Sequence, residues 1–578
     1  MPTLHWIGKE KVINHHMDVP FKVLEHSYGF YNGKLTETET KSGNKIIHGD
    51  NLTALKSLLP EYEGRINCIY IDPPYNTGNE TWVYNDSVND PRFKKWINEV
   101  VGKEGDDLSR HDKWCCMMYP RLKLLHKLLS DDGGIIFISI DDNELANLKV
   151  LMDEIFGLSS FIEYFSWIKT STAPSLARKS RKTTEYVLCY EKKKTNRKYK
   201  AEEGDGGDAP LLNSGNASVE LVFPKDILIF KLDDGTYPVG QYERLTLNNE
   251  IYIQDGYADK DIRLTGEFKW TQKTLDEEIE NGTTFIIKSE KFAIRYLRET
   301  DTFKAPTNLL KEKYFTPLVD KKEAGVETNE GAKKEIIDIF GKAVFDYPKP
   351  SSLVEFFVKF MDNKNGIVLD SFAGTGTTGH AVLNLNKKDK GNRNFILIQI
   401  DETNKKGEFT NIAETITAER VRRVIKGFGT TEGTGGGFDF YELGQPLFNE
   451  EGNLNETVGI EKIRQYVYYT ETKQSLNYDL FDLHDKHDFK NKTDENQTNQ
   501  TNHKNHSSDS FLGKHNDTAY YFNYQKDEVT TLDHAFLATM KTKAEQYVIY
   551  ADNCLLTKDF MTKHHIIFKK IPRDITRF

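Results

Sequence analysis

Two short motifs contain residue types that could do chemistry. In the first, IDPPYNTG, the residues Asp72, Pro73, Pro74 and Tyr75 follow the apolar run INCIYI. Consecutive prolines fix φ and donate no backbone hydrogen bonds, so nearby carbonyl oxygens stay available as acceptors. The Asp72 carboxylate and the Pro73 carbonyl could hold both hydrogens of an exocyclic amino group, so that its lone pair attacks an electrophilic methyl group while Tyr75 stacks on the ring. The alternative is a Pro-Pro turn capped by aspartate.

The second motif is DSFAGTGTTGHAV, in which Gly374, Gly376 and Gly379 have the spacing G-x-G-x-x-G after the apolar run GIVLD. Glycines at the start of a helix allow a tight turn and a close approach of the backbone to a nucleotide-like ligand. A nicotinamide-dependent oxidoreductase would have a similar loop. A turn needed only for packing a helix on a strand would look the same.

Two further segments suggest binding. In YPKPSSLVEFF, Ser352 and Glu355 have the spacing of a capping box, which predicts that a helix begins there. Lys349 lies just ahead, and an ammonium beside a helix N-terminus suits a carboxylate ligand, although an ordinary helix start would look alike. The stretch 168–200 contains 11 Lys or Arg against 2 Glu. Such a stretch suits contacts to phosphates, or it is a solvated run of charge. The candidate phosphate contacts are Arg178, Lys179, Arg181 and Lys182.

Five apolar runs must position these motifs, and each ends in an acidic residue. Uninterrupted apolar runs of this length predict strands buried on both faces, and amphipathic helical stretches follow them. We therefore expect an α/β fold with a doubly wound, mostly parallel sheet, whose ligands bind at the carboxyl ends of the strands. The acidic residues gather there, although any single one could simply end a strand or cap a helix. The runs end at Asp50, Asp72, Asp141, Asp370 and Asp401.

Changes of composition along the chain predict its domains. Short alternating apolar segments after a break at EEGDGGDAP indicate a mostly β insertion, GFGTTEGTGGG is typical of a flexible linker, and 484–510 is polar enough to be disordered. The predicted divisions are an N-terminal extension (1–43), the catalytic half of the sheet domain (44–200), the insertion (201–335), the glycine-loop half (336–428), a linker and start of a C-terminal region (429–483), the low-complexity segment (484–510) and a small C-terminal α/β domain (511–578).

The composition limits the class of protein less than the motifs do. The 578 residues are 38% hydrophobic and 29% charged, and neither a membrane span nor a signal peptide is visible, which predicts a cytoplasmic protein that binds no membrane. Five scattered cysteines indicate neither disulfides nor a metal site. The net charge of −10 argues against nucleic acid at face value, but the excess of basic residues in 168–200 shows that the charge is unevenly spread.

The motifs and their order resemble the β class of DNA amino-methyltransferases, in which the DPPY element comes first, a long insertion follows, and the cofactor loop comes last. The likeness is closer still to the modification (Mod) subunit of type III restriction-modification systems. It rests on HGDNLTAL, YIDPPYNTGNE, MMYPRLKLLHKLL, DDGGIIFISIDDNE, YPKPSSLVEFF, SFAGTGTTGHA and the closing FKKIPRDITRF. It covers most of 44–200 and 340–425, with a weaker likeness at 517–578.

The resemblance implies a permuted Rossmann-like methyltransferase fold that binds S-adenosyl-L-methionine. It implies that Asp72, Pro73, Pro74 and Tyr75 hold a flipped adenine. Among the cofactor-binding residues, Asp50 would lie beside the adenine of the cofactor, and either Gln399 or Asp401 would bind its ribose. The remaining residues expected around the cofactor are Asp370, Phe372, Gly374, Gly376 and Lys349.

The hypothesis is a DNA adenine-N6 methyltransferase that needs no metal and acts on double-stranded DNA. The insertion is the candidate for target recognition, and Mod-type relatives imply a homodimer and a helicase-nuclease restriction subunit. Cytosine-N4 transfer, a catalytically inactive DNA-binding subunit and methylation of a protein glutamine remain alternatives. Relatives that methylate glutamine usually have Asn in place of Asp72 and place the glycine loop first.

Overall fold

The computed structural model divides the chain into two compact units, one formed by 1–197 together with 308–578 and the other by Lys198–Thr307. Each unit is described by itself. The described residues are 3–76, 110–170, 172, 180–197, 199, 202–203, 208–298, 303–304, 308, 325–361, 363–403, 409–449, 451–455, 457–476, 510–526, 528–572 and 574–575. Within them, no helix is both long and apolar enough to span a membrane.

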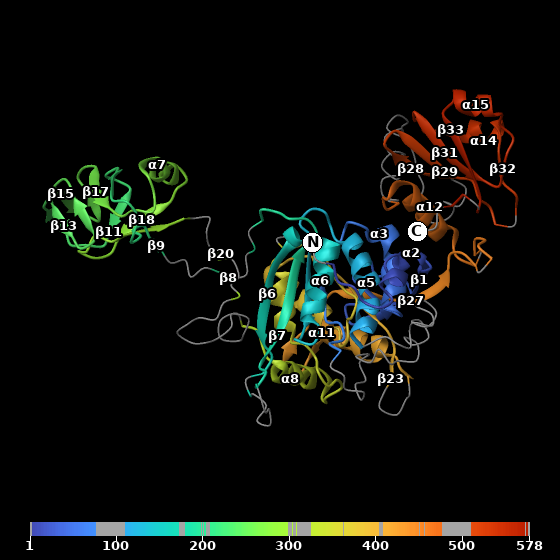
Figure 1. Ribbon diagram of the computed structural model, residues 1–578, viewed down its shortest axis with the longest axis horizontal. Coiled ribbons are helices and arrows are strands. Elements are labelled where there is room, and N and C mark those ends of the chain that lie inside the picture. Colours follow the sequence, from blue (N-terminus) through green and yellow to red (C-terminus); the bar gives the residue numbers. More distant parts are fainter. Residues whose placement is uncertain are drawn as a thin grey trace, which may run out of the picture. The chain divides into compact units, whose positions relative to one another are not determined.

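A 10-stranded sheet organises the larger unit (Figure 1). Its strands are, in spatial order, β2 (Lys34–Thr36), β1 (Lys22–Tyr31), β27 (Gly437–Pro446), β3 (Lys45–His48), β22 (Asn394–Gln399), β21 (Ile367–Asp370), β4 (Cys68–Ile71), β5 (Ile135–Ile140), β7 (Thr184–Glu191) and β6 (Phe161–Ile168). The strands from β27 to β5 are parallel, and antiparallel strands complete both edges. The predicted doubly wound, mostly parallel sheet is confirmed.

The five apolar runs of the sequence form the middle of this sheet, as β3, β22, β21, β4 and β5. All residues of β4 and β5 are buried, because helices cover both faces. On one face α3 (Asn51–Tyr62) packs on α5 (Arg110–Leu128), which packs on α6 (Leu145–Phe156), as the blue and cyan helices of Figure 1.

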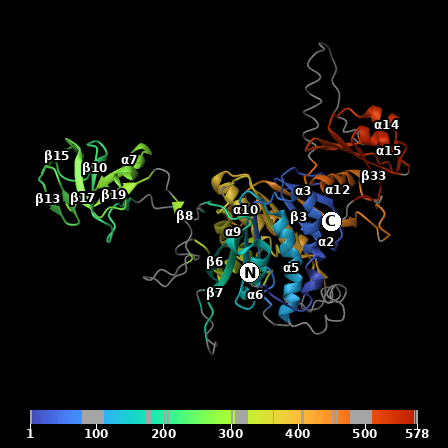
Figure 2. The same cartoon turned by 45° about the horizontal axis from the view of Figure 1, so that its top comes forward.

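The other face carries α8 (Asn329–Phe340), α9 (Ser351–Val358), α10 (Thr377–Asp389) and α11 (Glu419–Lys426). Phe137 of β5 contacts Phe357 of α9 with ring centroids 4.6 Å apart, and α9 and α10 lie side by side (Figure 2). Short helices α1 (Lys9–Val12), α2 (His15–Asp18) and η2 (Leu158–Ser160) and the strand pairs β23 (Glu402–Thr403) with β24 (Phe409–Thr410) and β25 (Gly427–Phe428) with β26 (Thr431–Glu432) complete this part.

Two regions predicted to lie outside the sheet contribute strands to it: 1–43 contributes β1 and β2, and 429–483 contributes β27. The glycine-rich segment GFGTTEGTGGG, predicted to be a linker, forms the hairpin of β25 and β26 and leads directly into β27. β27 pairs in parallel with β3 and antiparallel with β1, which lies in the predicted N-terminal extension. Asn44, directly before β3, bonds to β27 on one side and to β22 on the other, because its side-chain amide donates to the Gly437 carbonyl and its side-chain oxygen accepts from the Phe395 N–H.

The C-terminal residues form a smaller sheet accompanied by short helices, in line with the predicted small α/β domain. Its strands are β28 (Phe511–His515), β29 (Thr518–Phe522), β31 (Gln546–Ala551) and β33 (Ile566–Lys570), accompanied by β30 (Thr531–Leu532), β32 (Asn553–Cys554), α14 (His534–Thr539) and α15 (Lys558–Lys563). The preceding α12 (Ile460–Thr472) shares an apolar core with this sheet and with Val23 of β1. The predicted low-complexity segment 484–510 lies, except for Ser510, outside the described residues.

The unit Lys198–Thr307 is mostly β, as the alternating segments predicted. Its main sheets have the orders β10-β17-β14-β13, β11-β18-β19-β9 and β12-β15-β16. The elements are β8 (Glu202–Glu203), β9 (Ala209–Pro210), β10 (Val219–Phe223), β11 (Leu228–Phe230), β12 (Gly235–Tyr237), β13 (Gly240–Tyr242), β14 (Leu245–Leu247), β15 (Ile251–Gln254), β16 (Tyr257–Ala258), β17 (Ile262–Gly266), α7 (Gln272–Glu280), β18 (Thr284–Ile287), β19 (Ile294–Leu297) and β20 (Phe303–Lys304). The unit ends before α8, whose residues up to 335 were predicted to belong to the insertion, whereas α8 packs on α11 of the larger unit.

Candidate active site at the ends of two adjacent strands

The two motifs singled out in the sequence leave neighbouring strands. β4 and β21 pair in parallel, with Cys68 opposite Val368, so the carboxyl ends of both strands lie at the same edge of the sheet. From this pair the chain winds outward in opposite directions, through α5 to β5 and through α10 to β22. Such a reversal opens a crevice beyond the strand ends, which is where ligands bind in open α/β sheets.

The Asp72 carboxylate is held by two donors. Its Oδ1 accepts from the Tyr75 hydroxyl at 2.9 Å, and its Oδ2 lies 2.9 Å from the Lys349 ammonium. Burial raises the pKa of Asp72, and Lys349 opposes that rise. The Pro74 carbonyl accepts from the indole of Trp114 at 2.7 Å, whereas no donor among the described residues contacts the carbonyl of Pro73. Asp72 and Pro73 therefore present acceptors at the strand end.

The turn after Tyr75 is held in place by the buried carboxylate of Glu144. Asn76 has a φ of 55°, and its amide donates to the carboxylate of Glu144, which is fully buried. The same carboxylate contacts His111 Nδ1 at 2.7 Å and accepts from the amide of Asn147 at 2.7 Å. Glu144 was not predicted as a functional residue. Nothing in the sequence distinguishes its run DDNE from an ordinary helix start.

The glycine loop lies on β22 and on the segment before α11. The Gly374 N–H donates to the side-chain oxygen of Gln399 at 2.7 Å, and the Gly374 carbonyl accepts from the Thr417 hydroxyl at 2.6 Å. Gly376 has a φ of +79°, and a Cβ there would lie 3.0 Å from the Thr417 carbonyl. Both the conformation and the space therefore require glycine at this position.

Asp370 closes the loop from the end of β21. Its carboxylate accepts from the Phe372 N–H at 3.0 Å and from the Thr378 hydroxyl at 2.6 Å. Burial raises the pKa of Asp370 to about 7, and the two donors lower it by less. Asp370 therefore fixes the conformation of the loop through buried hydrogen bonds to both of its ends.

The remaining predicted cofactor-binding residues differ in how exposed their side chains are and in the contacts that they already make. Asp50 caps α3 through the Thr53 N–H at 2.9 Å, and its side chain is 41% exposed. Gln399 is buried and already holds Gly374, whereas Asp401 is about a third exposed and contacts His48 Nε2 at 2.8 Å. Asp401 is therefore better placed than Gln399 to meet a ligand.

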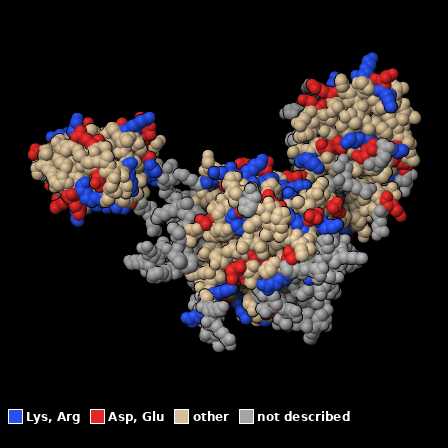
Figure 3. Space-filling view, in the orientation of Figure 1, with Lys and Arg blue, Asp and Glu red and all other residues tan. Residues whose placement is uncertain are grey.

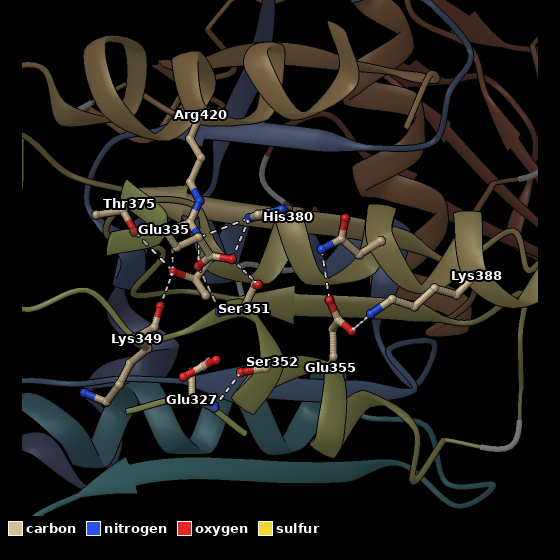
Figure 4. Close-up of polar contacts among 12 residues, drawn as sticks. Glu327, Glu335, Lys349, Ser351, Ser352, Glu355, Thr375, His380, Lys388 and Arg420 are labelled. Carbon is tan, nitrogen blue, oxygen red and sulfur yellow. Dashed lines mark hydrogen bonds and ion pairs between the residues drawn. The ribbon is translucent and has the colours of Figure 1, made fainter. Parts of the chain in front are cut away.

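The Lys349 ammonium contacts the DPPY motif. Its Nζ lies 2.9 Å from Asp72 Oδ2, 3.6 Å from Glu185 Oε2 and 4.9 Å from the ring centroid of Tyr75. The predicted capping box is wrong. Pro350 takes the cap position of α9, and the Ser352 hydroxyl accepts instead from the Glu327 N–H. Glu355 pairs with Lys388 of α10 (Figure 4).

A buried cluster behind the loop was also missed (Figure 4). Arg420 of α11 is fully buried and donates to the hydroxyls of Thr375 and Thr377 at 2.7 Å and 2.9 Å. It also pairs with Glu335 of α8 at 2.8 Å and contacts His380 Nδ1 at 3.1 Å. In the sequence Arg420 is one of three arginines in an amphipathic helix, so no local signal separates it from the less buried Arg422 and Arg423.

Only part of the predicted phosphate-binding stretch can be described. Arg178 and Lys179 lie outside the described residues, Arg181 is exposed, and the Lys182 ammonium pairs with Asp142. On the face drawn in Figure 3, basic and acidic side chains alternate over both units. The role of this stretch stays a prediction.

Comparisons with known proteins point to one family. Residues 66–472 match N6_N4_Mtase, a family of DNA methylases. The chain is 32% identical over 446 residues to the type III restriction-modification enzyme StyLTI Mod subunit of Salmonella typhimurium. The match covers 70% of this chain and 61% of that protein, so the chain spans less than two thirds of the length of this relative. It is 32% identical over 473 residues to the EcoPI Mod subunit of Escherichia phage P1, covering 74% and 69%. It is 30% identical over 375 residues to the type II methyltransferase M.KpnI of Klebsiella pneumoniae, covering 62% and 81%.

Proposed function

The chain belongs to the N6_N4_Mtase family of DNA methylases, and from this premise we propose that it methylates the N6 amino group of a flipped adenine in double-stranded DNA. The observation that carries the proposal is the pair of acceptors at Asp72 and Pro73, which stand at the end of the strand next to that of the glycine loop. An exocyclic amine needs two acceptors of this kind if its lone pair is to become nucleophilic.

S-adenosylmethionine is the methyl donor in this proposal, and the residues present fit it. Gly376 lets the glycine loop pack closely on Thr417, which holds the loop at the start of α10, where a ligand can meet the helix N-terminus. The buried hydroxyl of Ser371 has no partner among the described residues, and carboxylates at Asp50 and Asp401 suit a cationic molecule with ribose hydroxyls. When bound, the cofactor supplies a methyl group already activated on a positively charged sulfur.

The residues of the chain supply alignment and acceptors. Asp72 and Pro73 accept the hydrogens of the amino group, and this interaction strengthens as positive charge grows on nitrogen. Tyr75 stacks on the base that has left the duplex. Trp114 and Glu144 hold the turn, so that the acceptors keep their places without a cost of reorganisation during the reaction.

The biological setting is a further part of the proposal. Two of the relatives are named Mod subunits of type III restriction-modification enzymes. We therefore propose that this chain is a modification subunit that works as a homodimer and assembles with a restriction subunit. Size-exclusion chromatography with light scattering tests the dimer, since a monomer that methylates DNA at full rate would contradict it.

The activity is tested by incubating the purified protein with labelled cofactor and mixed plasmid DNA, and by separating the nucleosides after digestion. We expect label in N6-methyladenine. Label only in N4-methylcytosine would reassign the base within the same family, and label only in protein would overturn the proposal.

Asp72→Ala tests the acceptor. We expect transfer to fall below detection while the dissociation constant for the cofactor changes by less than about threefold, because Asp72 contacts the amine and not the cofactor. Asp132→Ala, in an exposed turn after α5, is the matched control and should keep full activity. Loss of cofactor binding and transfer together in Asp72→Ala would indicate a structural role.

A further inference from the structure

Four charged side chains meet at the DPPY motif, and only Asp72 belongs to that motif. Lys349 precedes α9, Glu185 lies on β7, and Lys169 follows β6. Besides its contact with Asp72, the Lys349 ammonium lies 3.6 Å from Glu185 Oε2, and the Lys169 ammonium lies 3.1 Å from Glu185 Oε1. Two ammonium groups and two carboxylates thus alternate across four segments of the chain.

The inner pair of this network is deeply buried. The side chains of Lys349 and Glu185 are 9% and 8% exposed, whereas Asp72 is 26% exposed. A buried charge is costly unless it is paired, so each member depends on its neighbours. Burial by itself lowers the pKa of Lys349, but Asp72 and Glu185 outweigh that effect and the pKa lies above its usual value. Lys349 is therefore a fixed positive charge.

The network leaves Asp72 able to accept further donors. Among the residues that the structure describes, each of its oxygens contacts a single donor, Tyr75 at Oδ1 and Lys349 at Oδ2. An ionised carboxylate oxygen accepts two hydrogen bonds, so each retains one free direction. The Tyr75 hydroxyl has one hydrogen and lies 2.9 Å from Asp72 and 3.2 Å from Glu185, so it can satisfy only one of them at a time.

We propose that Lys349 is a positioning residue for the methylation reaction, which keeps the Asp72 carboxylate ionised and aimed, and that Glu185 holds the Lys349 ammonium in place from β7. This inference rests on the proposed function. It assigns Lys349 to the catalytic carboxylate instead of the carboxylate of the cofactor. It also adds Glu185, which no sequence motif marks.

The protonation state of Asp72 depends on every charged or titratable group that faces it. A protonated Asp72 would donate from one oxygen and lose an acceptor, so the reaction needs the ionised form. Lys349 favours that form, whereas burial and Glu185 oppose it. The groups concerned are Lys349, Glu185, Lys169, Tyr75, Tyr70 and Asp370.

Lys349→Met removes the counter-ion of Asp72. The single-turnover methylation rate, measured from about pH 5 to about pH 9, should fall at least roughly tenfold at neutral pH, and its acid limb should move up by at least about one pH unit. The dissociation constant for the cofactor, measured by calorimetry, should stay within about twofold. Lys349→Arg should return the acid limb to its wild-type position, and Lys359→Met, at the exposed end of α9, should change neither quantity.

Glu185→Gln should move the acid limb in the opposite direction. Glu185 raises the pKa of Asp72, so its neutralisation lowers that pKa, while the loosened Lys349 ammonium lowers the rate at every pH. Shifts of opposite sign in two variants of one buried network cannot arise from general loss of structure.

Two results would overturn the inference. One is weaker cofactor binding in Lys349→Met with an unmoved acid limb, which would mean that Lys349 serves the cofactor. The other is an unmoved acid limb in both variants. A wild-type protein that methylates no DNA would instead overturn the proposed function, so the two failures are distinguishable.

Discussion

Among single residues, Asp370 shows how burial couples the glycine loop to pH. Burial raises the pKa of its carboxyl from the ordinary 3.8 to about 7. The folded state therefore keeps a proton that the unfolded state releases between these values. The stabilising contribution of the protonated carboxyl is complete below about pH 4 and is lost as pH rises through about 7.

Asp370→Asn should remove this dependence. The amide resembles the protonated carboxyl and can still contact Thr378 and Phe372. We expect the wild-type free energy of unfolding to fall by up to roughly 1.4 kcal/mol per pH unit from this group between about pH 5 and 7, and the variant to lack that slope. Urea unfolding at several pH values measures it, with the exposed Asp559→Asn as control. Parallel slopes in wild type and Asp370→Asn would contradict the prediction.

We expect Asp401 and Gln399 to have different roles, cofactor binding and support of the glycine loop, which the sequence could not separate. Asp401→Asn should weaken cofactor binding by about tenfold or more with little change in unfolding free energy, because a charged acceptor at a partly exposed position is lost. Gln399→Leu should instead destabilise the protein, because it removes the acceptor of the Gly374 N–H. Calorimetry and urea unfolding of both variants decide the matter, and an exchange of the two phenotypes would reverse the assignment.

The chemistry of the site was predictable where it depends on local pattern. DPPY and the glycine spacing follow apolar runs, and parallel strands bring their ends to one edge. The partners of these residues come from distant segments: Glu185 lies 113 positions from Asp72 (185 − 72) on another strand, and Glu144 anchors Asn76 from the start of α6. Single acidic residues carry no sign of such partners.

For elements, the least predictable feature was how the sheet is completed. The central strands are continuous apolar runs, so they can be recognised as strands from the sequence alone. β1 and β27 lie toward an edge. β1 mixes buried, partly buried and exposed residues, and only the first five residues of β27 are buried, so neither resembles the middle strands along its whole length. β27 follows a glycine-rich hairpin that is typical of a linker. Its place beside β3 is set by long-range pairing and not by its own composition.

The helices of the second face are joined by Arg420. Burial alone would raise the pKa of Glu335, but Arg420 and His380 outweigh it, and the pKa lies below its usual value. Glu335 in turn accepts from the Ser351 hydroxyl at the start of α9. The cluster thus fixes α8, α9, α10 and α11 around the glycine loop.

Arg420→Met should destabilise the larger unit by about 3–5 kcal/mol, because Glu335 is left in the interior without its counter-ion. The double variant Arg420→Met/Glu335→Gln should recover part of the loss, since no uncompensated charge remains. Chemical denaturation measures both. Arg423→Met, one turn along the same helix and partly exposed, is the control and should cost less than about 1 kcal/mol. Equal losses in the single and double variants would contradict the assignment.

For the whole molecule, the net charge of −10 does not point to the proposed partner, DNA. Carboxylates concentrate at strand ends around the candidate cofactor site, while the excess of basic residues in 168–200 precedes the insertion. Net charge describes the sum, and recognition depends on where the charges lie. The insertion lies in the chain between β7 and α8, directly after this basic stretch, and for this reason we propose that it recognises the target.

The unit Lys198–Thr307 has its own apolar core, formed by residues such as Leu221, Leu264 and Phe285. A segment of this size with a separate core can fold alone. We therefore expect the isolated segment 198–307 to unfold cooperatively in urea.

Replacing 198–307 by a flexible Gly/Ser linker should leave cofactor binding and the stability of the larger unit nearly unchanged, because β4, β21 and the glycine loop lie outside the segment. Site-specific methylation should be lost, since the acceptors at Asp72 and Pro73 would remain without the surface proposed to select the target base. Sequencing of modified bases in cells that express each form compares the site pattern. A deletion variant that keeps the wild-type pattern would move target recognition back into the larger unit.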